Sequence, residues 1–141
     1  MNLLGVLDAL KDAAAGVPNV KVAALGINQA WPSTPAVEVI ASDVRLQTFA
    51  AGSLDQLMSG RVVLAVYVAL TQNLEADERE LVPIAEGLVD ALNTGSFDRT
   101  LGGLVEDVRP IGIDFDLVKR NGRFYRTASV TVAIGDLEDN V

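Results

Sequence analysis

The sequence predicts a single α+β domain, residues 1–141, in which two helices pack on one face of an antiparallel or mixed sheet of about four to five strands. Three observations predict it. Two segments carry apolar residues at helical spacing, one segment alternates with the period of a strand, and one unbroken apolar run marks a buried strand. The chain has 141 residues, the usual size of one domain.

The first element is a helix over residues 2–15. Asn2 is the expected N-cap, and Gly16 followed by Pro18 is the expected end. The apolar residues of this segment recur every three or four positions, so one face is expected to be buried: Leu3, Leu7, Leu10 and Ala14.

Two strands are expected next, over residues 20–27 and 36–42. The loop between them holds two prolines and the only tryptophan, Trp31. Two interpretations of Trp31 stay open: a lid over the core, or an exposed anchor for a partner protein.

Residues 43–60 are expected to form an irregular excursion, with or without a short extended piece near Leu46. An excursion of this length in a small domain is often functional. Its apolar side chains favour an arm that contacts a neighbouring subunit over a loose loop. The contact residues expected in this arm are Leu46, Phe49, Leu54 and Leu57.

Residues 61–72 contain nine consecutive apolar residues, which predicts a strand that is covered on both faces. An acidic connection over residues 73–78 and a second helix over 79–93 follow. Pro83 is tolerated only near a first turn, so the regular helix is expected to start late. Its buried stripe is expected to be Leu81, Ile84, Ala85, Leu88 and Leu92.

The last third of the chain predicts a hairpin, after a glycine-containing link over residues 94–103. Residues 104–118 are extended, with Pro110 and Gly112 requiring a bulge or an edge position. The Asn121-Gly122 pair predicts a tight turn. Residues 123–134 then return as a strand with Val130, Val132 and Ile134 on one side, and residues 135–141 form a mobile acidic tail.

Catalytic chemistry is not expected, nor is a cofactor or a metal. The chain has no Cys and no His, which removes thiolate nucleophiles and the commonest general base. It lacks the Gly-rich motifs that bind phosphate. Asp114 and Asp116 share a strand face, where a solvated surface is favoured over a metal or acid–base pair. The carboxylates at 75, 77, 78 and 80 are expected to favour the positive end of the second helix rather than to bind a cation.

A basic cluster surrounds the predicted turn: Lys119, Arg120, Arg123 and Arg126. It is interpreted as a nucleic-acid contact, as a contact to an acidic neighbouring subunit, or as a solvated turn. The formal net charge of −8 argues against the first. The longest apolar run is far too short for a membrane helix, and no signal peptide is expected.

Five segments, in this order, are similar to a known family: LLGVLDAL at 3–10, PAVEV at 35–39, RVVLAVYV at 61–68, the helix at 80–92, and the hairpin IDFD…NGRFYRTASVTV at 113–132. Over nearly its full length, the chain resembles the tail terminator family of tailed bacteriophages, also called tail completion or minor tail proteins.

The resemblance implies a structural virion protein of the tail, assembled in the host cytoplasm. It implies a homo-oligomeric ring, a hexamer in this family, that caps the tail tube, stops its polymerisation and provides the surface on which the head docks. The implied partners are other copies of the chain, the tail tube protein and the head–tail connector protein, with DNA passing through the ring without specific binding. The alternatives are a related tail-tube or head–tail joining protein and a small ligand-binding module.

Overall fold

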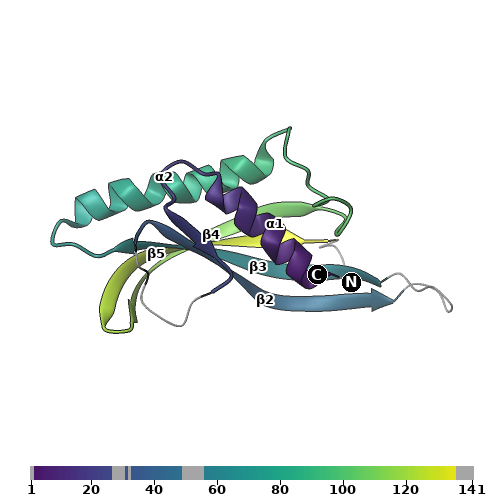
Figure 1. The fold of residues 1–141 in the computed structure, drawn as a ribbon, viewed down its shortest axis with the longest axis horizontal. Helices are drawn as coiled ribbons and strands as arrows, with labels where there is room; N and C mark the ends of the chain where they lie inside the picture. Colours follow the sequence, from purple (N-terminus) through teal and green to yellow (C-terminus); the bar gives the residue numbers. More distant parts are fainter. Residues whose placement is uncertain (1, 27–30, 32, 49–55, 136–141) are drawn as a thin grey trace.

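The protein is a two-layer sandwich of helices on a sheet (Figure 1). The computed structural model describes residues 2–26, 31, 33–48 and 56–135, with the backbone alone at 46–48 and 56–58. These residues form two helices and five strands, and both helices lie on the same face of the sheet. The predicted α+β class is confirmed.

The elements follow one another as α1 (Leu3–Ala15), β1 (Val22–Ala24), β2 (Ala36–Thr48), β3 (Gln56–Ala69), α2 (Leu74–Asn93), β4 (Val108–Arg120) and β5 (Arg123–Ile134). Across the sheet the strand order is β1-β2-β3-β5-β4, and β4 is therefore an edge strand. The short β1 runs parallel to β2, and all other neighbours are antiparallel, which makes the sheet mixed.

The core lies between the helices and one face of the sheet, here called the helix face. Helix α2 contributes all five apolar residues of its predicted stripe, each almost completely buried. They pack against alternate residues of the central strands β3 and β5, which is the two-residue period of a strand. Burial of each Leu or Ile side chain of this stripe contributes about 1.5–3 kcal/mol. The strand residues in this cluster include Val62, Leu64, Val66, Val130, Val132 and Ile134.

Side-chain caps fix where both helices start. The Asn2 carboxamide accepts a hydrogen bond from the Gly5 amide at 2.8 Å, as predicted. The Asn73 side chain accepts one from the Ala76 amide at 3.1 Å in the same way. The expected acidic connection at 73–78 is therefore wrong, because the Asn73 cap starts α2 at Leu74.

Pro83 lies inside α2, not in its first turn, which corrects the expected late start. Proline offers no amide hydrogen to the carbonyl of Arg79, four residues earlier. Pro83 and Arg79 are both exposed, so water can satisfy that carbonyl. Neither helix of the described chain has the length and hydropathy that crossing a membrane requires.

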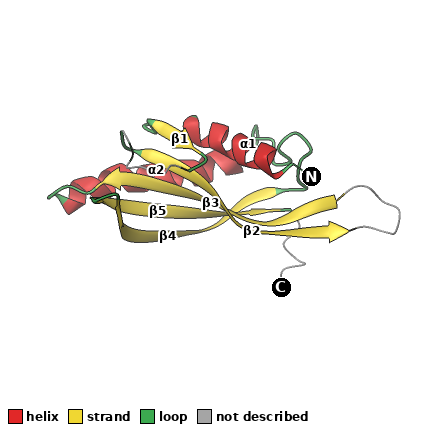
Figure 2. Ribbon diagram, turned by 60° about the horizontal axis from the view of Figure 1, so that its bottom comes forward, coloured by secondary structure: helices red, strands yellow, loops and turns green. Residues whose placement is uncertain are grey.

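The expectation of an irregular excursion at 43–60 is also wrong. Strand β2 continues to Thr48 and β3 begins at Gln56, and the two remain in register through the pairs from Val44↔Gly60 to Thr48↔Gln56. The outer part of this pair, residues 43–48 and 56–59, is here called the ribbon. The ribbon extends past the rest of the sheet in both views (Figures 1 and 2).

Gly60, a residue type that weakens a strand interior, is a paired residue of β3 beside a register shift between Ala41 and Asp43. Of the expected contact residues of the arm, Phe49 and Leu54 lie outside the described residues. Leu46 and Leu57 lie in the ribbon, where the backbone alone is described.

The β4–β5 hairpin agrees with the sequence in three respects. The register shifts between Pro110 and Gly112, and β4 is an edge strand. Asn121 and Gly122 both have positive φ, 50° and 79°, as a type I′ turn requires. Strand β4 begins at Val108, later than the expected 104, and the tail from residue 136 onward lies outside the described residues.

Strand β3 is covered less evenly than its apolar run predicts. Its even-numbered residues from Val62 to Val68 are buried on the helix face. On the other face Val63 and Tyr67 are only half-buried, although Ala65 is buried. Both helices lie on one side of the sheet. The other face of β3 is covered by the aromatic cluster that is described in the next subsection.

Candidate functional site

The sheet face away from the helices, here called the open face, carries a compact polar and aromatic group at one end. We call this group the clamp cluster: Trp31, Glu38, Tyr67, Arg120 and Tyr125. Trp31 precedes β2 in the chain, and the other members come from β2, β3, β4 and β5. The register places Tyr67 and Glu38 on the open face, since they pair with residues of the same set.

An ion pair forms the centre of the clamp cluster. Arg120 Nη2 lies 3.0 Å from Glu38 Oε2. The Tyr67 hydroxyl donates to Glu38 Oε1 at 3.3 Å and accepts from Arg120 Nη1 at 3.3 Å. Glu38 is only 5 % exposed, so its charge is compensated inside the fold. The hydrogen bond to Glu38 is the main cause that raises the pKa of Arg120.

This contact requires a strongly curled sheet. Arg120 and Glu38 lie on β4 and β2, with β5 and β3 between them. Arg120 pairs with Arg123, and Glu38 is level with Ser129 through Ala65, six residues further along β5. In a flat sheet the Cα atoms of Arg120 and Glu38 would be roughly 25 Å apart, because three strand spacings of about 4.8 Å and six residues of about 3.3 Å separate them. The tip of the β4–β5 hairpin therefore bends over the open face, and the two strands are visibly curved there in Figure 1.

Trp31 fills the concavity that this bend creates. Its ring is 1 % exposed, stands 5.6 Å from the Tyr67 ring between centroids, and lies beneath the Arg120 guanidinium at 5.8 Å. The Trp31 amide donates to the Tyr125 hydroxyl at 3.3 Å. The structure thus shows Trp31 as a lid, though over the open face and not over the main core. The alternative of an exposed partner anchor is wrong for this chain, because the ring is covered.

Tyr67 makes the clamp cluster sensitive to alkaline pH. Burial, followed by the negative charge of Glu38, raises the pKa of its phenol above the ordinary 10.0. The folded protein keeps this proton at a pH where the unfolded chain loses it. The free energy of unfolding should therefore fall as pH rises from about 10 through the higher folded pKa.

We expect Tyr67→Phe to remove the part of the stability loss at alkaline pH that comes from the phenol of Tyr67. Urea unfolding of both proteins between pH 8 and 11 measures it, because the difference in stability between them should narrow as pH rises. A difference that stays constant over this range would contradict the assignment.

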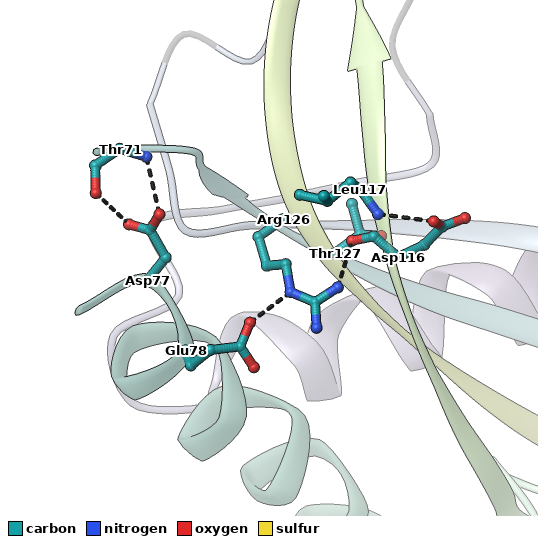
Figure 3. A network of polar contacts seen from close by, with 7 residues as sticks. All are labelled: Thr71, Asp77, Glu78, Asp116, Leu117, Arg126 and Thr127. Atoms are coloured by element: carbon teal, nitrogen blue, oxygen red, sulfur yellow. Dashed lines mark hydrogen bonds and ion pairs between the residues drawn. The ribbon is translucent and has the colours of Figure 1, made fainter. Parts of the chain in front are cut away.

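The four basic residues around the turn do not form one patch. Arg120 belongs to the clamp cluster, and Arg126 forms an ion pair with Glu78 of α2 (Figure 3). Lys119 lies over the Phe124 ring at 5.4 Å from its centroid, and Arg123 is exposed at the tip. Arg120 and Arg126 therefore form ion pairs within the fold, and Lys119 and Arg123 are exposed at the surface.

The acidic residues near the start of α2 have structural partners. Asp77, 3 % exposed, accepts hydrogen bonds from the Thr71 amide at 2.9 Å and the Thr71 hydroxyl at 2.7 Å (Figure 3). Glu75 pairs with Arg79 one turn later. Glu78 and Arg126 join α2 to the β4–β5 hairpin. These carboxylates stabilise the first turns of the helix and its docking on the sheet.

The second acidic pair lies in solvent. Asp114 and Asp116 are both exposed, and their pairing with Ser129 and Thr127 places them on the open face. Within the described part of the chain, no group of three or more His, Cys, Asp or Glu residues could hold a metal ion.

A cleft of about 510 Å³ lies beside the clamp cluster. Its walls come from Trp31, Ser33 and Thr34, from residues 69–72 at and after the end of β3, and from the start of β5. The lining combines aromatic rings, hydroxyl groups and one cation, and includes Trp31, Thr34, Leu70, Arg123, Phe124 and Tyr125.

Sequence reasoning missed Glu38, Tyr67 and Tyr125. One signal was available: Glu38 is the only charge in the apolar run AVEVI, at a position that alternation assigns to the same face as Ala36 and Ile40. A charge at such a position needs a partner. The sequence could not identify that partner as Arg120, which lies far away along the chain.

In comparisons with known proteins, no family model matches the chain, and no curated protein matches it.

Proposed function

We propose that this protein is a structural subunit of a tailed-phage virion, a tail terminator that works as a closed ring of identical copies. The ring, of six copies in the family that the sequence resembles, caps the tail tube, ends its polymerisation and offers a surface for head docking. The proposal gives the chain no catalytic role. Its partners are further copies of the chain, the tail tube protein and the head–tail connector protein.

The observation that carries this proposal is the edge strand β4. Ile111, Phe115 and Leu117 of this strand are 48 %, 45 % and 56 % exposed. On its outer side, β4 has no neighbour among the described strands. Two of its backbone groups already have side-chain partners: the Leu117 amide donates to the Asp116 carboxylate, and the Val108 carbonyl accepts from Arg99. Pro110, the register shift beside it and the exposed Asp114 and Asp116 partly blunt this edge, yet its three exposed apolar side chains remain. A partner that adds to this edge would cover both the backbone groups and the apolar side chains.

The ribbon supplies a second surface at another place on the sheet. Its residues pair only with each other among the described strands, because β1 pairs with β2 at Ala36 to Glu38 and β5 reaches β3 at Gly60. An isolated two-stranded hairpin is marginal in water, so contact with a neighbour would stabilise it. Two different surfaces on one subunit suit a head-to-tail contact, which forms a ring when the rotation closes.

The charge of the chain is compatible with a channel for DNA. The net charge is −8, and two of the four cations at the turn are neutralised within the fold. Such a surface repels the phosphate backbone more than it binds it, so DNA could pass without being held.

Size-exclusion chromatography with light scattering tests the proposal, with negative-stain imaging of the same sample. We expect wild-type protein to form a closed oligomer, alone or after addition of tail tubes. Leu117→Asp should give a folded monomer, because a charge at the β4 edge cannot be buried without a partner.

Leu4→Asp is the matched control. Leu4 is 60 % exposed on α1, which packs on β1 and β2 at the opposite end of the strand order from β4, so the same change of side chain should leave the oligomer intact. A wild-type protein that remains monomeric and does not bind tube ends would refute the proposal. An oligomer that survives Leu117→Asp would refute the role of β4.

A further inference from the structure

We propose that the cleft at the β4–β5 tip binds the acidic C-terminal segment, residues 136–141, of a neighbouring copy of this chain. The inference rests on the proposed function only in taking the partner to be a second copy. It assigns to the cleft an acidic peptide that carries apolar anchors.

The cleft has the two features that such a peptide requires. Phe124, 55 % exposed, and the buried Tyr125 and Trp31 line it, which gives an apolar and aromatic wall. Arg123 belongs to the same lining and is exposed. Lys119 adds a second cation over the ring of Phe124. Carboxylates would pair with the two cations, and an aliphatic side chain would pack on the rings.

The wall also contains a buried indole donor. The indole Nε1 of Trp31 is buried and has no hydrogen-bond acceptor among the described residues. A buried donor that lacks an acceptor destabilises a folded protein. An acceptor that enters the cleft beside Trp31 would reduce this cost after a small shift of the ring.

Residues 136–141 have the matching chemistry. Their sequence is Asp-Leu-Glu-Asp-Asn-Val, with three carboxylates and two aliphatic side chains in six residues. The chain as a whole is acidic, with a net charge of −8. The three carboxylates of this segment are opposite in charge to Arg123 and Lys119 at the cleft, and its aliphatic side chains match the aromatic wall.

The segment cannot reach the cleft of its own subunit. Strand β5 ends at Ile134, which pairs with Gly60, while Tyr125 of the cleft pairs with Ala69. Nine residues along the strand separate these two points, or about 30 Å. The seven residues from Gly135 to Val141 span at most about 25 Å when fully extended. A segment bound in the cleft therefore comes from another copy, and the contact runs head to tail.

A peptide titration tests this inference. The receptor is the full chain with Asp136→Asn, Glu138→Gln and Asp139→Asn, so that its own tails no longer compete for the cleft. The probe is a labelled peptide with the native sequence of residues 135–141, followed by fluorescence anisotropy. We expect saturable binding that weakens as salt is added.

Arg123→Glu in this receptor should weaken peptide binding at least about tenfold, because it replaces an attraction by a repulsion. Arg109→Glu is the matched control: Arg109 is exposed on the same hairpin but lies level with Ala133, far from the cleft. It changes net charge equally and should leave binding unchanged. A peptide with its three carboxylates replaced by amides should not bind.

Absence of binding to the receptor, or equal loss in both arginine variants, would overturn the inference. Binding of the amide peptide would do the same. Light scattering on the wild-type chain separates this result from the proposed function: a ring can form without peptide binding, and a monomer can still bind the peptide.

Discussion

Gly60→Ala should destabilise the protein by about 3 kcal/mol, because the backbone leaves no room for a methyl group. A Cβ at this position would lie 2.1 Å from the carbonyl oxygen of Asp43 and 2.9 Å from the Cα of Val44. Both are backbone atoms of β2, so rotation of a side chain cannot relieve the clash. The φ angle of 156° adds strain for a residue with a side chain.

Thermal and urea unfolding would measure this loss, and we expect the melting temperature to fall by roughly 10 °C. Gly112→Ala is the control. Gly112 also follows a register shift in a strand, but a Cβ there would meet no atom within 4 Å, and its φ is not positive. Its stability should change by less than about 0.5 kcal/mol. Equal effects of the two substitutions would show that loss of glycine flexibility, and not the contact with β2, is responsible.

Glu38→Ala should lower the free energy of unfolding by about 2–3 kcal/mol. It leaves the Arg120 guanidinium without its anion, and the Arg120 side chain is only 23 % exposed. Removing one partner of a buried pair is strongly destabilising, and the residual exposure of Arg120 to water moderates the cost. The bend of the hairpin tip should also relax, because this pair joins the outer strand β4 to β2.

The single tryptophan reports that relaxation. Trp31 lies under Arg120, so opening of the tip should hydrate the indole and shift its fluorescence to longer wavelength. Asp114→Ala, which removes an exposed carboxylate from the same face, should change neither stability nor emission. A double-mutant cycle of Glu38→Ala with Arg120→Ala would give the coupling energy. Additive losses would contradict a direct role of the pair.

Local signals predicted the elements that depend on near neighbours in the chain. The stripe of α2, the alternation of β5 and the Asn121-Gly122 turn were all predicted correctly, since each depends on spacing within a few residues. Proline and glycine at 110 and 112 correctly indicated the bulge and the edge position of β4.

The same local reasoning was wrong where a partner strand or a cap decided the outcome. Residues 43–60 mix polar and apolar residues without clear periodicity, and it is pairing between β2 and β3 that makes most of them extended. The acidic residues after position 73 looked like a connection, but the Asn73 cap and the Asp77–Thr71 hydrogen bonds make them the start of α2.

Hydrophobic periodicity and backbone preferences act over short distances, and they sufficed to predict the fold class, α1, the buried stripe of α2, the turn and the face that β5 buries. Only the tertiary structure decided the strand order, the ribbon, the burial of Trp31 and the partners of Arg120 and Arg126. The burial of Trp31 and the contact of Arg120 with Glu38 depend on the curl of the sheet, which brings together side chains as distant in sequence as Trp31 and Tyr125, 94 residues apart. The Arg126–Glu78 pair depends on the docking of α2 on the sheet. Pattern along the chain carries no record of that curl, because it arises from packing across strands.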